Sequence, residues 1–297
     1  MATLEGVAPV RATSGRRGRD LRKLLLHLVL LAAGLAMVFP FVWMLLTSFK
    51  SRPDIFNGGI DPWPRQWGIV ENYSRILFDV PMPRYLLNGA IVCLGIMALQ
   101  ILVAAPVAYA LAKLKFRAAR WLLPLIVVAL AIPAFLPTLP LYLAFRLTGL
   151  ISSSSGAFGN YAALILPFSI SAFGVFLLRQ HFKSVPDELV HAARLDGMSD
   201  WSIVWRVMVP HARPAIVAFC IFSVVAHWND LFWPLIVISD NTYATPPIGI
   251  IAFVNESVGG GDYGPLMSAT TAVTLPIIPV YLLGQRFMAD GMALMGK

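Results

Sequence analysis

Residues 186–197 read Pro-Asp-Glu-Leu-Val-His-Ala-Ala-Arg-Leu-Asp-Gly and lie in a polar stretch, 183–213, of an otherwise apolar chain. Pro186 is favoured in the first turn of a helix, and the acidic pair after it complements the positive end of the helix dipole. Ser184 precedes them and can cap the helix. Gly197 supplies the left-handed conformation that ends helices. The stretch therefore predicts a short helix closed by a glycine turn.

A second amphipathic segment follows, so the stretch is expected to form two short helices that project from the membrane as a compact knob. Three- and four-residue spacing places three side chains on one face of the first helix: Leu189, Ala192 and Ala193. The same spacing places four apolar side chains on one face of the second segment: Trp201, Val204, Trp205 and Met208.

The composition places the chain in a membrane. Hydrophobic residues make up 58% of the 297 positions, charged residues only 13%, and the mean hydropathy is +0.73, whereas soluble domains have about 45–50% apolar and about 25% charged residues. A helix crosses a hydrocarbon core of about 30 Å with about 20 residues. Six apolar runs are long enough: 24–49, 86–112, 121–145, 158–178, 214–238 and 264–285. The predicted fold class is an all-α membrane protein with six transmembrane helices.

The net charge of +8 reflects membrane topology and does not indicate nucleic-acid binding. Lys and Arg are retained on the cytoplasmic side of membranes. With both termini in the cytoplasm, 17 of the 23 Lys and Arg residues fall in cytoplasmic segments. The expected divisions are a basic cytoplasmic N-terminal tail (1–23), a six-helix domain (24–290) with its cytoplasmic loop (183–213), a cytoplasmic C-terminal tail (291–297), and outer loops that include 50–85 and 241–263.

No catalytic residue, metal site or bound cofactor is predicted for this chain. Cys93 and Cys220 fall inside apolar runs, where thiols usually behave as small buried hydrophobes. The C-terminal residues 291–297 match Gly-x-x-x-x-Gly-Lys, but no Ser or Thr follows, so we do not expect this chain to bind ATP.

Prolines are dense in the third apolar run, at Pro124, Pro133, Pro137 and Pro140. Each proline removes a backbone donor and kinks or breaks a helix. Membrane proteins tolerate such breaks where other helices or a water-filled path satisfy the freed carbonyl groups, which suits a gated pathway. The alternative is that proline is simply commoner in membrane helices than in soluble ones.

His227, Asn229 and Asp230 are the candidate residues of a substrate pathway. Such side chains are costly in hydrocarbon, so by default they face a cavity or a partner. The alternative is that they lie near the outer end of the fifth run, where they cap backbone groups or pair between subunits. Weaker candidates, of a kind more often used for hydrogen bonds between helices, are Asn88, Gln100, Tyr109, Ser169, Ser171, Thr270, Thr271 and Thr274.

Three elements of the polar stretch form a recognisable pattern: Ala192-Ala193, Asp196-Gly197 and Pro210. They resemble the cytoplasmic loop of permease subunits in binding-protein-dependent ABC importers, in which Glu-Ala-Ala is followed by Gly and later by Pro. His191 stands where that pattern has Glu. Further segments extend the resemblance to the maltose-type carbohydrate importers over nearly the whole chain: Thr47-Ser48-Phe49-Lys50, Asn72-Tyr73, Trp228-Asn229-Asp230 and Trp233-Pro234-Leu235.

The resemblance implies the type I ABC importer permease fold in the cytoplasmic (inner) membrane. It also implies a second permease subunit as heterodimer partner, an ATPase dimer that holds ATP and Mg, and an extracytoplasmic substrate-binding protein. The cytoplasmic loop would seat in a groove of the ATPase as a coupling helix. The lipid bilayer is then the remaining partner, and nucleic acid is not one.

The residues assigned to ATPase coupling are Glu188, His191, Ala192, Ala193, Asp196, Gly197, Trp201, Trp205 and Pro210. Aromatic residues dominate binding hot spots, which favours a protein contact for the two Trp residues. An ion pair from the family Glu does not carry over to His191, and Glu188 or Asp187 would have to replace it. The alternative is an amphipathic helix on the lipid surface, which also uses Trp but requires neither the glycine turn nor the Ala-Ala pair.

The expected function is a permease subunit for import of a sugar or sugar derivative. A glycerol-3-phosphate or polyol importer is the close alternative, because the related permeases share Ser48-Phe49-Lys50 and the ending Arg179-x-His181-Phe182. From another class, an ion-coupled secondary transporter also has bent helices and a buried Asp, but it needs no docking knob and normally shows an internal repeat. An intramembrane enzyme would need a nucleophile or metal site that the sequence does not suggest.

Overall fold

The computed structural model describes residues 14–57, 61–133, 135–152, 155–258, 261 and 263–285. Within these ranges the regular secondary structure is helical, apart from one isolated antiparallel bridge between Lys50 and Trp67. The predicted all-α fold class is confirmed. The first helix begins at Ser14, inside the segment expected as a tail. Residues 1–13 and the expected C-terminal tail (291–297) lie outside the described residues.

Three helices of the described chain are long and apolar enough to cross a membrane. They are α1 (Ser14–Ser48), α4 (Met82–Lys113) and α15 (Tyr263–Thr274), which continues after a turn to Gln285. Two further candidates are bent helix pairs. One joins α7 (Gly156–Ile165) and η1 (Leu166–Phe168) to α8 (Ala172–Ser184) at 51°, and the other joins 200–211 to α12 (Arg213–Trp228) at 83°.

The third apolar run is divided into two shorter helices, α5 (Ala119–Ala131) and α6 (Thr138–Leu147). The break contains Pro133 and Pro137, as the loss of two backbone donors predicts. Length and composition thus support three to five crossings in the described residues. The count of six and the cytoplasmic termini stay predictions.

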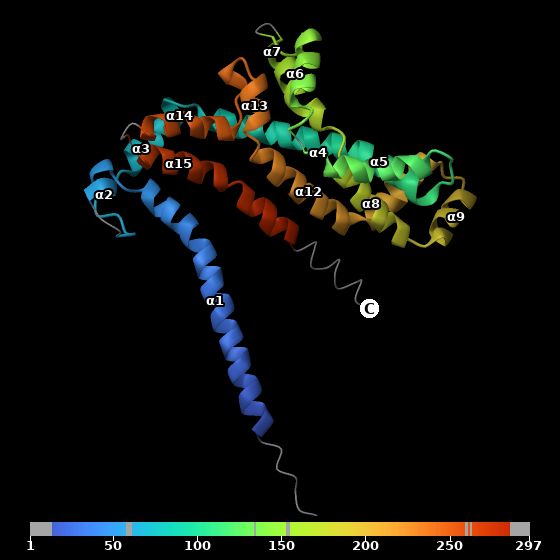
Figure 1. Cartoon of the computed structure of the whole chain (residues 1–297), viewed down its shortest axis with the longest axis horizontal. Helices are drawn as coiled ribbons and strands as arrows, with labels where there is room; N and C mark the ends of the chain where they lie inside the picture. Colours follow the sequence, from blue (N-terminus) through green and yellow to red (C-terminus); the bar gives the residue numbers. More distant parts are fainter. Residues whose placement is uncertain are drawn as a thin grey trace, which may run out of the picture.

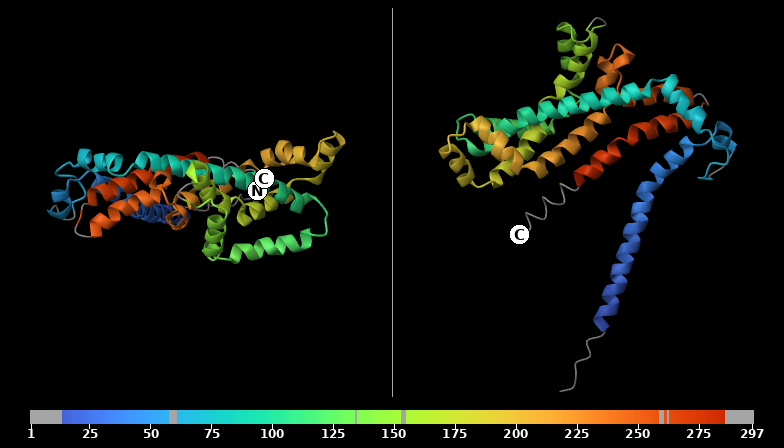
Figure 2. Two further views of the ribbon diagram at one scale, coloured as in Figure 1. Left: turned by 90° about the horizontal axis from the view of Figure 1, so that it is seen from above. Right: turned by 180° about the vertical axis from the view of Figure 1, so that it is seen from behind.

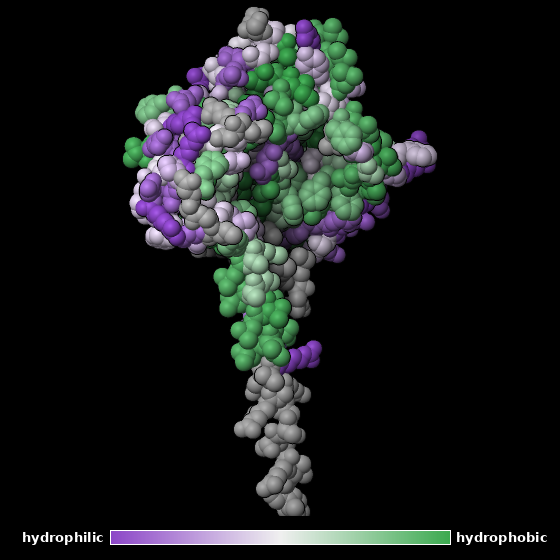
Figure 3. Space-filling model, turned by 60° about the vertical axis from the view of Figure 1, so that its left-hand side comes forward, coloured by the Kyte–Doolittle hydropathy of each residue, from purple (hydrophilic) through white to green (hydrophobic). Residues whose placement is uncertain are grey.

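Helix α1 leaves the rest of the chain as a rod (Figure 1). The space-filling view shows a largely hydrophobic surface along it (Figure 3), and none of its apolar window is buried within the chain. An apolar surface of this size is stable only against lipid or other apolar helices. The end of α1 at Ser48 packs on the body at α15.

Helix α4 is the central element of the body, and α8 and α12 run beside it (Figures 1 and 2). Ala104, Ala105 and Ala108 of α4 are fully buried, in one core cluster with Leu178 and Phe182 of α8. Small side chains allow the backbones of two membrane helices to approach closely. The alanines therefore make α4 and α8 a tightly packed pair.

The two segments expected as outer loops contain helices. Residues 50–85 hold α2 (Arg52–Asn57) and α3 (Ile69–Phe78), and residues 241–263 hold η3 (Asn241–Tyr243) and α14 (Pro246–Val258). The expectation of a loop is wrong for α14. Its two prolines occupy the first helical positions, where no backbone donor is needed, so they begin a helix and do not break one.

Asn72 of α3 joins three helices. Its side-chain amide donates to the backbone carbonyl groups of Ser48 and Lys50, both at 2.9 Å, and the residue is 1% exposed. The Ser268 hydroxyl of α15 donates to the same Ser48 carbonyl at 3.2 Å. These bonds fix the ends of α1, α3 and α15 against one another.

Replacing Asn72 with alanine should destabilise the folded protein by about 1–3 kcal/mol, because two buried carbonyl groups lose a donor. Thermal unfolding of the purified protein in detergent measures the loss. Ser74→Ala is the control on the same helix, since the Ser74 hydroxyl donates to the carbonyl of Glu71 at the exposed surface and to no other group among the described residues. Equal stability of the two variants would contradict the assigned role of Asn72.

Candidate functional site

The polar stretch folds as two short helices around a turn, as the sequence predicts. Helix α9 (Asp187–Leu195) begins directly after Pro186, and no side chain caps it. The predicted cap by Ser184 is wrong, because Ser184 is the last residue of α8 and its hydroxyl donates to the carbonyl of His181 one turn earlier.

Lys113, at the end of α4, binds the residues at the start of α9. Its Nζ donates to the backbone carbonyl of Val185 and to Oδ1 of Asp187, each at 2.5 Å. The Lys113 side chain is 5% exposed and the Asp187 side chain 70% exposed. The loop is therefore tied to α4 at the point where it leaves α8.

Gly197 closes α9 in the left-handed conformation, with φ of 78°. Its N–H donates to the carbonyl of Arg194, and the N–H of Met198 donates to the carbonyl of Ala193, both at 3.0 Å. This arrangement satisfies carbonyl groups that the helix end leaves free. The predicted glycine turn is confirmed by the backbone geometry.

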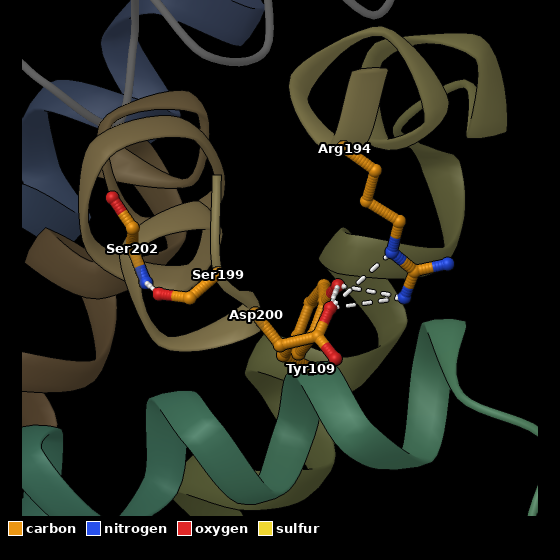
Figure 4. A network of polar contacts seen from close by, with 5 residues as sticks. All are labelled: Tyr109, Arg194, Ser199, Asp200 and Ser202. Atoms are coloured by element: carbon orange, nitrogen blue, oxygen red, sulfur yellow. Dashed lines mark hydrogen bonds and ion pairs between the residues drawn. The ribbon is translucent and has the colours of Figure 1, made fainter. Parts of the chain in front are cut away.

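The second half of the loop contains a π turn that the sequence did not suggest. It runs through α10 (Asp200–Ile203), the π-helical turn η2 (Val204–Met208) and α11 (Val209–His211). The Ser199 hydroxyl accepts from the N–H of Ser202 at 3.3 Å and so caps α10 (Figure 4). Pro210 lies in the first turn of α11, where proline is favoured.

A three-residue network attaches the second helix to α4 (Figure 4). The Tyr109 hydroxyl of α4 donates to Oδ1 of Asp200 at 2.8 Å, and Nη2 of Arg194 donates to the same oxygen at 3.0 Å. Arg194 belongs to α9, so this one carboxylate joins both loop helices to α4. Tyr109 is therefore a helix-to-loop contact, a role that the sequence left open.

The two carboxylates that attach the loop to α4, those of Asp187 and Asp200, are ionised at neutral pH. Hydrogen bonds from the Tyr109 hydroxyl and the Arg194 guanidinium lower the pKa of Asp200 below its ordinary value of 3.8, and the hydrogen bond from Lys113 lowers the pKa of Asp187. A carboxylate with a lowered pKa contributes stability above its ordinary pKa and loses it as the pH falls through the lowered value. The loop should stay attached at neutral pH and loosen only below about pH 4.

The buried residues of the two loop helices match only in part the two sets of side chains that helical spacing places on one face. In α9 the buried residues are Val190 and Ala193, whereas Leu189 is 40% exposed and Ala192 is exposed. Helical spacing alone did not identify which neighbouring face meets α4 and α8. In the second half, the buried residues are Ile203, Val204 and Met208. The half-buried Trp205 packs against this cluster, whereas Trp201 is exposed and does not belong to it.

The other side of the loop is uncovered. Trp201 is 58% exposed and packs edge-on against the half-buried Trp205, with ring centroids 5.7 Å apart. Leu195 is 89% exposed, although the sequence reasoning did not single it out. The position of Leu195 directly before the Asp196-Gly197 turn, at the end of the predicted helix, could have indicated that it is exposed. We call the uncovered residues the loop surface: Glu188, Leu189, His191, Ala192, Leu195, Asp196, Gly197 and Trp201.

A cavity of about 680 Å³ forms where three helices are interrupted. Phe135 lies in the break between α5 and α6, Thr138 is the first residue of α6, and Phe168 lies at the end of η1 before α8. His227 lies in the last turn of α12, and Asp230 lies in the break between α12 and α13 (Phe232–Val237). The structure thus brings together three breaks that lie far apart in the sequence. The remaining lining residues are Leu141, Ala226, Phe232 and Trp233.

The three predicted pathway residues are placed differently. Asp230 lines the cavity and also caps α13, since its Oδ1 accepts from the N–H groups of Phe232 at 3.0 Å and Trp233 at 3.4 Å. His227 lines the cavity with its ring 4.8 Å from that of Phe168. Asn229 is exposed outside the lining and donates to the carbonyl of Val225 in its own helix at 2.7 Å.

Comparison with known proteins identifies a family and a fold. Residues 100–292 match the family described as "Binding-protein-dependent transport system inner membrane component". The chain is 31% identical over 267 residues to the "Diacetylchitobiose uptake system permease protein NgcG" of Streptomyces coelicolor, an alignment that covers 90% of this chain and 86% of the relative.

Two solved structures of bacterial transporters share the fold. A chain of an ABC transporter involved in the import of the acidic polysaccharide alginate superposes with a TM-score of 0.76 at 22% identity, over 94% of this chain and 99% of that one. A chain of the alginate transporter in complex with an alginate pentasaccharide-bound periplasmic protein superposes with a TM-score of 0.54 at 13% identity, over 90% and 94% of the two chains.

Asp200→Asn should loosen the second loop helix from α4. A neutral amide oxygen accepts the hydrogen bonds from the Tyr109 hydroxyl and the Arg194 guanidinium more weakly than a carboxylate does. Amide hydrogen exchange of residues 187–211 should rise while exchange of α4 stays unchanged. Asp196→Asn is the control in the same loop, because the Asp196 carboxylate has no hydrogen bond or ion pair within the described residues. In the wild type, the protection of these amides relative to the intrinsic exchange rate at each pH should stay constant around neutral pH and fall below about pH 4; a loss of protection near pH 7 would contradict the assignment.

Proposed function

Because this chain belongs to the family of binding-protein-dependent transport system inner membrane components, we propose that it forms half of the translocation pathway of an ATP-driven sugar importer. As a sugar ABC importer permease, it is a multi-pass membrane protein and not an enzyme. We place it in the cytoplasmic membrane, paired with a second permease subunit. ATP and Mg would be held by separate ATPase subunits.

The observation that carries the ATP-driven part of the proposal is a loop held firmly on one side and uncovered on the other. Lys113 and Tyr109 tie it to α4, while Leu195 and Trp201 are exposed. A rigid surface with apolar anchors is what a protein interface needs. It suits a groove on an ATPase subunit, whose movement would then pull directly on α4.

The same surface fits an ATPase better than it fits lipid. Glu188 and Asp196 are exposed on it beside the apolar side chains. Anionic membrane surfaces attract basic segments, and acidic side chains are repelled from them. The acidic residues therefore favour the protein contact over an amphipathic helix lying among headgroups.

The cavity is the proposed place where cargo passes this subunit. Irregular backbone at membrane depth is tolerated where it is buried in protein or lines a water-filled cavity, and discontinuous helices form the substrate sites of many transporters. Here three such breaks line one cavity. The pairing of polar groups with aromatic rings, Asp230 and His227 with Phe168, suits a sugar, which offers hydroxyl groups and an apolar ring face.

An uncharged sugar fits the cavity better than glycerol phosphate does. Asp230 carries the acidic group of the cavity, and neither Lys nor Arg is among its lining residues in the described chain. A phosphate group would need cationic partners there. We further infer delivery by an extracytoplasmic binding protein from the family description and from the periplasmic protein bound to the alginate transporter of similar fold.

Gly197→Pro should abolish the stimulation of ATP hydrolysis by cargo-loaded binding protein in the assembled complex. Proline fixes φ near −65° and removes the N–H that bonds to Arg194, so the turn cannot form. Gly149→Pro is a matched control, because Gly149 has φ of 77° and donates to the carbonyl of Arg146 at 3.1 Å but lies far from the loop in sequence. Unchanged stimulation in Gly197→Pro would rule out coupling through this loop.

Asp230→Asn and His227→Ala should each slow sugar uptake at matched expression. Asn retains the oxygen that caps α13, so the first variant tests the charge in the cavity and not the helix start. Asn229→Ala should transport normally, because Asn229 does not line the cavity. Normal uptake affinity and rate in both cavity variants would refute the pathway assignment.

A further inference from the structure

The buried side chain of Gln100 joins α4 to two elements of the cavity. Its Oε1 accepts from the Ser223 hydroxyl of α12 at 2.6 Å, and its Nε2 donates to the carbonyl of Phe168 at 2.9 Å. Nε2 of His227 lies 3.4 Å from the same amide nitrogen. Gln100 is 5% exposed. Both elements that it contacts are interrupted at the cavity, so a shift of either one must move or break these bonds.

The same helix carries the attachments of the loop further along. Tyr109 lies nine residues after Gln100 and Lys113 thirteen, or about 14 Å and about 20 Å along a helix axis. Pro106 lies between these positions and removes one backbone donor. The fully buried Ala104, Ala105 and Ala108 pack this part of α4 against α8, which braces the helix where proline would let it bend.

A second connection runs parallel to the first. Gln100 holds the carbonyl of Phe168, the last residue of η1. Helix α8 begins at Ala172, runs along α4 and passes directly into Pro186 and α9. Both α4 and α8 therefore connect the cavity wall to the loop, and Gln100 joins α4 to η1, which precedes α8, at the cavity end.

We propose that Gln100 is a positioning residue that transmits a change in the cavity to the coupling loop through the α4–α8 pair. The inference rests on the proposed function, since it takes the cavity as the cargo site and the loop as the ATPase contact. It adds a named residue through which cargo and ATP hydrolysis are linked. Gln100 itself need not touch the cargo.

The test uses the assembled importer in nanodiscs with its binding protein. Gln100→Leu has a similar volume and removes the hydrogen bonds to Ser223 and Phe168. Basal ATP hydrolysis should stay close to wild type, while stimulation by cargo-loaded binding protein should fall by about fivefold or more, the range of typical coupling energies. The change in amide exchange of residues 187–211 that cargo-loaded binding protein causes in the wild type should disappear.

Asn88→Leu is the matched control on the same helix. Asn88 is also buried; it donates to the backbone carbonyl groups of Thr242 and Ala244 and accepts from the Tyr161 hydroxyl of α7. It lies twelve residues before Gln100, on the side of Gln100 away from the loop attachments along α4. Its stimulation should remain normal. Where Gln100→Leu reduces the yield of assembled complex, Ser223→Ala removes one of the bonds alone and should lower stimulation in the same direction.

A double-mutant cycle separates transmission from general weakening. Tyr109→Phe removes only the hydroxyl that holds Asp200 at the loop end. Effects of distant independent sites add, whereas residues in one route do not, so the pair Gln100→Leu and Tyr109→Phe should cost little more than either change alone. Full stimulation in Gln100→Leu, equal loss in Asn88→Leu, or additive losses would overturn the inference. A wild-type complex without stimulation would instead refute the proposed function.

Discussion

An unpaired backbone group costs several kcal/mol in hydrocarbon, and this cost determines where the chain can interrupt its helices. The breaks after α5, η1 and α12 do not lie at random positions, because all three meet at one cavity. At two of these breaks, the structure shows a side chain that hydrogen-bonds to the free backbone groups. Asp230 caps the start of α13, and Gln100 accounts for the carbonyl of Phe168. The cavity is thus both a result of the breaks and the reason that they can be tolerated.

The loop at the other end of α4 is hydrogen-bonded to that helix on one side and uncovered on the other. One carboxylate, that of Asp200, accepts hydrogen bonds from Tyr109 and Arg194 and so joins three helices. Lys113 secures the start of the loop in the same way at Asp187. These contacts hold the loop through polar groups, and the apolar side chains of the loop surface stay exposed. In the importer that we propose, this surface is the contact with the ATPase.

Features that depend on residues close together in the sequence were predicted correctly. The glycine turn at Gly197, the proline-containing break in the third apolar run and the all-α class follow from backbone geometry and hydropathy. The buried faces of the loop helices could not be predicted in this way, because tertiary packing decides which neighbour covers Val190 and Ala193. The π turn has no clear sequence pattern of its own. His227 and Asp230 could be found as costly groups in an apolar run. Phe135 and Phe168 could not, because aromatic residues are ordinary there and only the fold brings them together. Asn229 shows the reverse case, a costly group satisfied within its own helix.

The π turn at Val204–Met208 has a consequence for how the loop can change in evolution. A π turn holds one more residue than the α-helical turn it replaces, and each α-helical residue advances the chain by about 100° around the axis. The wider turn absorbs the additional residue, so deleting one residue there would restore regular winding and leave Trp201 in nearly the same direction, whereas a deletion in the α-helical residues around it would rotate Trp201 by about 100° relative to the helix that enters the membrane. The loop can therefore gain or lose one residue at this turn without redirecting Trp201, and a relative with an uninterrupted α-helix there would present the same position in nearly the same direction.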